Sequence, residues 1–213
     1  RRENRRVILE ALLHAPGASR IDLVRTTGLS PSTVGQIASE LLAEGIVVES
    51  GIVDLERGRK PRLLQINPDA GRVIGIELST RRAAVFDVTC ALRAELGVLS
   101  DERDLMPDRL VRSAAERVEA LRGSGPPLLA LGVSVPGSVD RDIGFVVTSA
   151  PLGWSDIPLG AMLAEATGLM TLVQPNMVSL VVEESASGIA RNVQNFLYLH
   201  LGMRGIAAGI AAG

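Results

Sequence analysis

The stretch GLSPSTVGQIASELLAEG, residues 28–45, decides the fold of the N-terminal part of the chain. Gly28 can adopt the positive φ that a sharp corner between two helices requires. Ser30 and Pro31 follow it, and a serine cap with proline in the first turn is a strong signal for a helix start. Apolar residues then recur at helical spacing until Gly45, a residue type that ends helices. We therefore predict the turn and second helix of a helix-turn-helix.

The flanking sequence completes this unit. Residues 3–15, ENRRVILEALLHA, have the apolar spacing of an amphipathic helix, and Ser19–Asp22 has the pattern of a capping box that starts another. Residues 46–66 contain two β-like segments joined by a charged loop, which is the pattern of a wing. The order helix, helix, helix, hairpin predicts a winged helix-turn-helix domain over residues 1–66.

Two surfaces of this predicted domain suit DNA. The outer face of its third helix presents short hydrogen-bonding side chains that match base edges and phosphates. The loop RGRKPR, residues 57–62, is basic and extended, which suits a narrow minor groove. The alternative is an ordinary three-helix packing unit with a solvated basic loop. The predicted DNA-binding residues are Ser30, Ser32, Thr33, Gln36, Arg57, Gly58, Arg59, Lys60 and Arg62.

Charge is distributed unevenly along the 213 residues. Residues 1–62 carry ten Lys or Arg and eight Asp or Glu, whereas residues 63–213 carry twelve and sixteen. This asymmetry indicates an anion-facing module on an acidic body. Cys90 is the only cysteine, so neither an internal disulfide nor a cysteine-cluster zinc site can form within this chain. We expect no cofactor, no metal and no membrane span, because no apolar run approaches about 18 residues, and we expect a cytoplasmic location.

From Asn67 onward the pattern changes to that of an α/β domain. Residues 73–99 contain three short β-like runs joined by tight turns, and residues 108–122 form an amphipathic helical pattern. Strand-like and helix-like segments then alternate up to about residue 201. This order predicts an α/β domain with a mixed sheet over residues 67–213.

Four motifs from residue 58 onward resemble one family. They are GRKPRLLQINPDAGRVIGIEL (58–78), GVSVPGSVD (132–140), LGWSDIPL (152–159) and LYLHLGMRGIAAGI (197–210). In this order, behind a winged helix-turn-helix, they resemble the ROK family of repressors, open reading frames and kinases. The resemblance implies an actin-like, sugar-kinase-like (ribonuclease H-like) α/β fold that is incomplete in this sequence, with the first lobe and the start of the second. It also implies a homo-oligomer, a dimer or a tetramer.

The sequence departs from the family's kinases at three places. Their first phosphate loop, Asp-x-Gly-Gly-Thr, reads here as residues 77–81, ELSTR, and their second reads as residues 202–206, GMRGI. Their catalytic Glu-Asn-Asp reads as residues 174–176, Gln-Pro-Asn, and an amide cannot act as a general base. We therefore predict a degenerate kinase site and no enzyme activity. Pro136, Gly137 and Asn176, which follow strand-like runs, are the candidate contacts for an effector.

The leading hypothesis is a sequence-specific transcriptional regulator of the ROK family that acts on double-stranded DNA. A repressor is the favoured form, and an activator stays open as the alternative. Twofold symmetry of an oligomer predicts a near-palindromic operator. The resemblance implies that a sugar or sugar-derived molecule is its effector. Two alternatives stay open: a sugar kinase carrying a DNA-binding module, and a dimerisation scaffold that binds no ligand.

Overall fold

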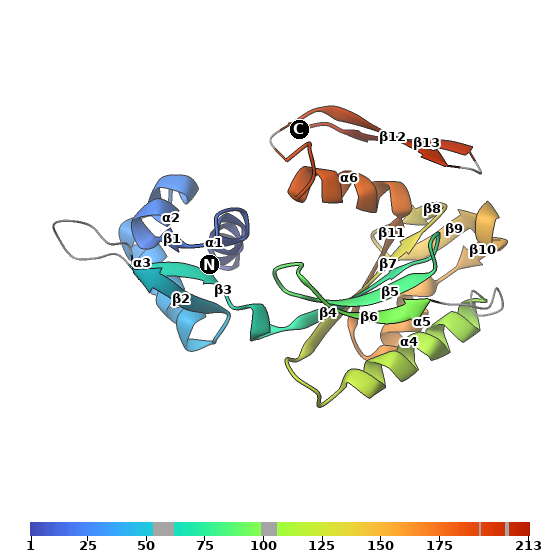
Figure 1. Ribbon diagram of the computed structural model, residues 1–213, viewed down its shortest axis with the longest axis horizontal. Helices are drawn as coiled ribbons and strands as arrows, with labels where there is room; N and C mark the ends of the chain where they lie inside the picture. The colour runs from blue at the N-terminus through green and yellow to red at the C-terminus, as the bar shows by residue number, and fades with distance from the viewer. Residues whose placement is uncertain (53–61, 99–105, 192, 203–204) are drawn as a thin grey trace. The chain divides into compact units, whose positions relative to one another are not determined.

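A computed structural model describes residues 1–52, 62–98, 106–191, 193–202 and 205–213 (Figure 1). These residues pack into two compact units. The first unit contains residues 1–72 together with 86–92 and 125–127, and the second contains the rest. Whether residues 1–66 and 67–213 are independent domains stays a prediction. Within the described residues, we find no helix that combines the length and the apolarity of a membrane span.

The first unit has the predicted winged helix-turn-helix order. Its three strands form one antiparallel sheet in the order β1-β3-β2, and the wing strands β2 and β3 pair from Val47 opposite Ile66 to Ile52 opposite Arg62. The elements are α1 (Arg2–His14), β1 (Ala18–Ser19), α2 (Arg20–Thr27), α3 (Pro31–Ala43), β2 (Val47–Ile52) and β3 (Arg62–Ile66).

Local signals set the start and the end of α2, the first helix of the helix-turn-helix. The Ser19 hydroxyl accepts a hydrogen bond from the backbone N–H of Asp22, and the Asp22 carboxylate accepts one in return from the N–H of Ser19, at 3.2 and 3.0 Å. Gly28 ends α2 in the left-handed conformation, with φ of 69°. Both features are confirmed as predicted, because each depends on residues within one turn of chain.

The buried hydrophobic cluster of the first unit is aliphatic. The three helices and two strands each contribute to it, and Val88, from the segment 86–92, packs against it. Burial of such side chains from several elements fixes how the helices cross. The buried residues are Ile8, Leu12, Leu23, Val34, Ile37, Ala38, Leu41, Val47, Leu64 and Ile66.

The second unit is built around a five-stranded sheet in the order β11-β7-β4-β5-β6. Helices α4 and α5 lie together on one face of this sheet, and α6 lies on the other (Figure 1). A three-stranded sheet, β10-β9-β8, and a two-stranded hairpin, β12-β13, complete the unit. The elements are β4 (Arg72–Glu77), β5 (Arg82–Asp87), β6 (Leu92–Val98), α4 (Pro107–Leu121), β7 (Leu128–Val135), β8 (Ser138–Asp140), β9 (Phe145–Ser149), β10 (Trp154–Ile157), α5 (Leu159–Thr167), β11 (Met170–Pro175), α6 (Asn176–Ala186), β12 (Phe196–Gly202) and β13 (Gly205–Ala211).

The carboxyl ends of three neighbouring strands meet at one edge of the large sheet. β7 and β11 are parallel, with Val135 opposite Pro175. The backbone N–H of Leu78, at the end of β4, donates to the carbonyl of Ser134 at 3.0 Å. The loops after β4, β7 and β11 therefore emerge side by side, which is where open α/β sheets place ligands.

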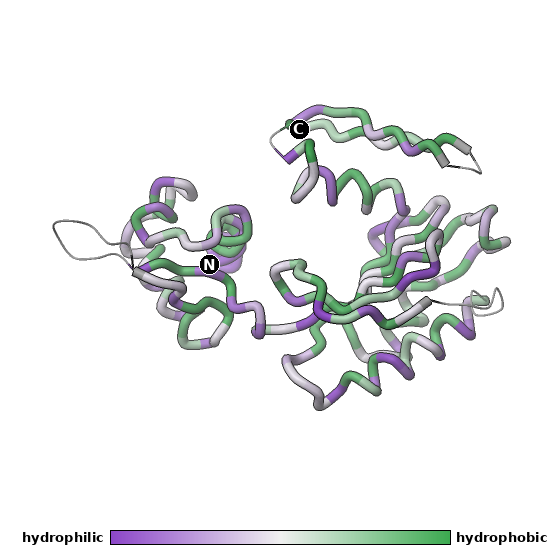
Figure 2. The backbone as a smooth tube through the Cα atoms, in the orientation of Figure 1, coloured by the Kyte–Doolittle hydropathy of each residue, from purple (hydrophilic) through white to green (hydrophobic). Residues whose placement is uncertain are grey.

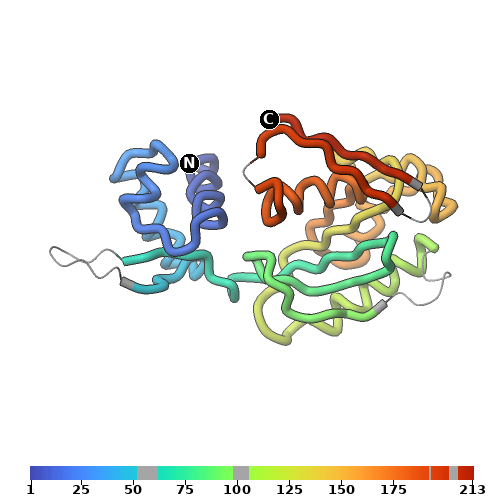
Figure 3. Tube along the Cα trace, turned by 45° about the horizontal axis from the view of Figure 1, so that its top comes forward, coloured from blue at the N-terminus to red at the C-terminus, as the bar shows by residue number. Residues whose placement is uncertain are grey.

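Two strands were not singled out in the sequence. Residues 138–140, which follow β7, pair with β9 as β8. The glycine-rich segment near residue 210 forms β13, which pairs with β12 and packs against α6 (Figure 3). Gly209 explains the close packing, because a Cβ there would lie 2.5 Å from Cγ2 of Val181.

One face of the β12-β13 hairpin is apolar and exposed. Residues paired across an antiparallel hairpin share a face, so alternate residues of the two strands form one patch. Hydrophobic residues run along both strands (Figure 2). The exposed members are Leu197, Leu199 and Leu201 on β12, and Ile206 and Ile210 on β13.

Candidate nucleic-acid interface

Ser30 organises the start of α3 by several hydrogen bonds. Its hydroxyl accepts from the backbone N–H of Thr33 at 3.2 Å, which caps the helix, and it lies 2.9 Å from the hydroxyl of Ser32 and 2.8 Å from that of Thr33. Thr33 is half-buried, whereas Ser30 and Ser32 are exposed. The predicted contacts Ser30 and Thr33 therefore lie within a cap, and Ser32 has the more open position.

Gln36 lies one turn beyond Ser32 on the exposed side of α3. Its side-chain nitrogen, Nε2, donates to Oε1 of Glu40 at 3.0 Å. The opposite face of α3 is buried in the core through Val34, Ile37 and others. Ser32, Gln36 and Glu40 thus form a polar row, spaced four residues apart, along the outward side of the helix.

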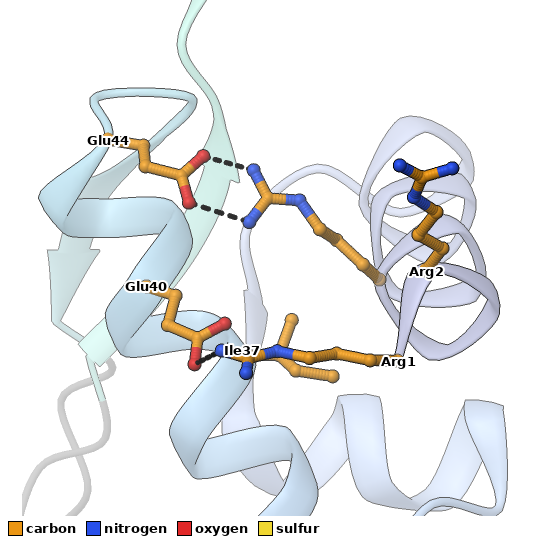
Figure 4. Close-up of a pocket in the computed structure, with 6 residues that line it drawn as sticks. Arg1, Arg2, Ile37, Glu40 and Glu44 are labelled. Carbon is orange, nitrogen blue, oxygen red and sulfur yellow. Dashed lines mark hydrogen bonds and ion pairs between the residues drawn. The ribbon is translucent and has the colours of Figure 1, made fainter.

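Two ion pairs join α3 to α1 across a shallow cleft (Figure 4). Arg5 makes a two-pronged contact with the carboxylate of Glu44, one bond measuring 2.7 Å, and Arg1 pairs with Glu40. Ile37 lines the same cleft. Sequence analysis missed these pairs. In the sequence, the only sign of them is that Arg1 and Arg5 are four residues apart, as are Glu40 and Glu44. This spacing does not predict the pairs, because contact also requires the two helices to cross at the correct place.

The Arg5–Glu44 contact shifts the titration of both groups. The hydrogen bond from Arg5 lowers the pKa of the Glu44 carboxyl below its ordinary value of 4.5. The same bond raises the pKa of the Arg5 guanidinium. Both groups are thus charged at neutral pH, and two-pronged arginine–carboxylate bonds hold geometry more firmly than single contacts.

Only part of the predicted wing contact lies within the described residues. Arg57, Gly58, Arg59 and Lys60 fall outside them. Arg62, at the start of β3, pairs with Glu49 on β2, with 2.5 Å between Nη1 and Oε2. The Arg62 side chain remains largely exposed in this pair, so its charge stays accessible to a solvent-side partner.

The three candidate effector residues lie at the strand-end edge of the second unit. Asn176 begins α6, and its Nδ2 donates to the hydroxyl of Ser79 at 3.2 Å. Pro136 and Gly137 follow β7, where the Pro136 carbonyl accepts from the buried Ser149 hydroxyl at 2.6 Å. The structure brings Asn176 to the loop after β4, while Pro136 and Gly137 are held against β9.

The loop after β4 is closed by its own carboxylate. Glu77 accepts hydrogen bonds from the backbone N–H groups of Ser79 and Thr80, at 3.0 and 2.5 Å. In a phosphate-binding loop such N–H groups face the ligand's anionic oxygens. Nearby, the hydroxyl of Ser134 is buried and has no hydrogen-bond partner among the described residues. In the segment that corresponds to the second phosphate loop, Gly202 ends β12 and pairs with Gly205 of β13, and residues 203–204 lie outside the described residues.

This architecture defines a class of protein: a winged helix-turn-helix followed by an α/β domain of the sugar-kinase type. Residues 1–48 match the family model described as winged helix-turn-helix DNA-binding. Residues 74–213, well over half of the chain, match the model of the ROK family. The chain belongs to the ROK family.

Relatives of the chain are longer proteins. Xylose repressors of Caldicellulosiruptor bescii and Bacillus subtilis are 27% and 26% identical to it; each match covers 97% of this chain and, respectively, 53% and 54% of the relative. A solved ROK family transcriptional regulator, a homologue of the E. coli MLC protein, has a TM-score of 0.79 at 20% identity and covers 98% of this chain and 54% of its own. The chain thus spans about half the length of the curated relatives it matches.

Proposed function

We propose that this protein is a sequence-specific DNA-binding transcriptional regulator, and that it acts as a repressor. The observation that carries the proposal is α3, which buries one face in the winged unit and exposes the polar row begun by Ser32 and Gln36. The xylose repressors support it, because their similarity extends over nearly the whole chain, including the DNA-binding unit.

In the proposed complex, α3 enters the major groove and the wing follows the adjacent minor groove. Ser30 and Thr33 hold the helix start, where backbone N–H groups face a phosphate, while Ser32 and Gln36 meet base edges. A homo-oligomer presents two such units, so the operator is near-palindromic, with half-site centres separated by about 10 base pairs or a multiple.

The test uses duplexes selected by the protein from a randomised DNA library, with binding followed by fluorescence anisotropy against salt. The double variant Arg57→Ala and Arg59→Ala should bind more weakly. Its plot of log affinity against log salt should flatten by about 0.9 for each arginine–phosphate interaction that the substitutions remove. A matched control is Arg109→Ala with Arg112→Ala, two exposed arginines of α4. If the Arg57/Arg59 double variant binds DNA with the same affinity and the same salt slope as the Arg109/Arg112 double variant, the proposed contact between the wing and DNA is wrong.

We also propose that the strand-end edge around Ser79, Gly137 and Asn176 binds a sugar-derived effector. The convergence of Asn176 with the loop after β4, and the unpartnered buried hydroxyl of Ser134, support this. Xylose is the first sugar to test, given the relatives. A ligand of the native state raises the melting temperature by mass action, so xylose should raise it for the wild type and less for Asn176→Ala. No shift with any sugar of a broad panel favours a ligand-free scaffold.

We propose that this edge carries out no phosphoryl transfer. Asn176 holds an amide where the family's kinases use a carboxylate base, and Glu77 occupies the N–H groups that phosphate would need. ATP-dependent phosphorylation of any hexose would establish the kinase alternative instead. A coupled assay for released ADP measures this phosphorylation.

A further inference from the structure

The orientation of the Gln36 amide is fixed by chemistry. Its neighbour Glu40 carries a carboxylate, and an ionised carboxylate can only accept hydrogen bonds. The amide atom that faces Glu40 must therefore be the nitrogen, which donates at 3.0 Å. The carbonyl oxygen Oε1 is then not the atom that faces Glu40, and the amide keeps a second N–H; when the N–H trans to the oxygen donates to Glu40, the oxygen and this second N–H lie side by side.

Glu40 is itself held in place. Arg1 pairs with Oε1 of Glu40 (Figure 4). This is the same oxygen that accepts from Gln36. The Glu40 side chain is only 27% exposed. A carboxylate near DNA would repel phosphates, and the arginine offsets that charge. Glu40 is therefore better placed to orient its neighbour than to contact DNA.

We propose that Glu40 is a positioning residue that makes Gln36 read adenine, an inference that rests on the proposed function. Adenine presents an acceptor, N7, beside a donor, the N6 amino group, in the major groove. An amide that offers its oxygen and one N–H matches this pair with two hydrogen bonds. Guanine presents two acceptors there, so the outward oxygen of Gln36 would face another oxygen or nitrogen lone pair.

The experiment selects binding sites from a randomised double-stranded DNA library with the full chain and its variants, followed by sequencing. The wild type should enrich an adenine at one position of each half-site. Gln36→Ala should lose that preference, which is worth about 5- to 150-fold for a good bidentate contact, while other positions stay as they were. Glu40→Ala should weaken the same preference, because the amide is then free to turn.

Glu40→Lys gives a sharper second test. An ammonium group only donates, so the amide oxygen should turn towards Lys and the two N–H donors should face the DNA. The preference at that position should move from adenine to guanine. Glu44→Lys is the matched control: it adds the same charge and also breaks an ion pair to α1, but it lies eight residues, about 12 Å, beyond Gln36. It should keep the adenine.

The outcomes separate the two proposals. If the wild type enriches no sequence at all, the proposed DNA-binding function fails. If it enriches a site but Gln36→Ala changes no position, or if the Glu40 variants leave the adenine preference as in wild type, the inference about Glu40 is overturned. A cytosine that is lost in Glu40→Ala but kept in Gln36→Ala would also overturn it, since Glu40 would then be reading the base itself. Thermal unfolding of each variant confirms that the comparison is between folded proteins.

Discussion

At the scale of single residues, Gly137 is the position with the least room for a side chain beside the candidate effector edge. A Cβ there would lie 2.2 Å from the carbonyl oxygen of Thr148 and 2.9 Å from the Cα of Ser149. Both are backbone atoms, so β9 would have to move. We expect Gly137→Ala to lower the free energy of unfolding by about 1–3 kcal/mol, as overpacking commonly does, measured by urea denaturation.

Gly35 is the control for this prediction. It lies inside α3, and a Cβ there meets nothing within 4 Å. Gly35→Ala should therefore raise stability, by about 0.5–1 kcal/mol, because alanine favours the helix. Loss of stability in both variants alike would show that the contact with Thr148 is not the cause.

The Glu44–Arg5 pair predicts a pH dependence at the residue scale. The pKa of Glu44 in the folded protein is lowered from 4.5. Its stabilising contribution is therefore complete above the unfolded-state pKa and is lost as the pH falls through the lower, folded-state value. Urea unfolding of the wild type and Glu44→Gln should differ near pH 7, and the difference should shrink below about pH 4.5. A difference that is constant across this range would contradict the assignment.

At the scale of elements, α2 depends on the cap residue that precedes it, Ser19. The Ser19 hydroxyl caps the backbone N–H of Asp22, and it also donates to the Asp22 carboxylate at 2.6 Å. Ser19→Ala should cost about 1 kcal/mol, within the range of 0.5–2 found for such caps, seen as a lower melting temperature. Ser39→Ala, an exposed serine whose hydroxyl only donates to the Gly35 carbonyl within α3, should cost nothing measurable.

The helices and strands differ in whether the sequence alone predicts them. The starts of α2 and α3 were predictable because Ser19, Gly28 and Ser30 act within one turn of chain. β8 and β13 were not, since three residues and a run rich in glycine and alanine become strands only by pairing with β9 and β12. Each forms by backbone pairing with the strand next to it in the chain, which its own composition does not reveal.

In the candidate interface, the sequence predicts local features but not long-range contacts. Helical periodicity placed Ser32 and Gln36 outward, as the structure has them. It could not assign Glu40 to Arg1 or Glu44 to Arg5, because those contacts join residues 39 positions apart. A contact between helices requires their crossing, and the crossing is set by the core beneath them.

At the scale of the whole molecule, the winged unit takes part of its core from beyond residue 66. Val88 packs against the buried cluster that contains Ile8 and Leu64. Val88→Ala should destabilise this unit by about 1 kcal/mol, given roughly 0.8 for each buried methylene-sized group, as measured by amide hydrogen exchange in α1 and α3. Val147→Ala, at a side chain 44% exposed, is the control and should leave that exchange unchanged. Unchanged exchange in both would place Val88 outside the cooperative core.

The apolar face of the β12-β13 hairpin has a consequence for the behaviour of this chain in concentrated solution. Leu199 and Leu201 are 58% and 76% exposed. Contiguous exposed apolar patches of this kind promote self-association of proteins. Light scattering should show clustering that grows with protein concentration, and Leu199→Lys with Leu201→Lys should delay its onset. Ile189→Lys, at a residue that is 98% exposed and lies outside the two strands, should have far less effect. The solubility of the chain would then be governed by five aliphatic side chains rather than by its net charge.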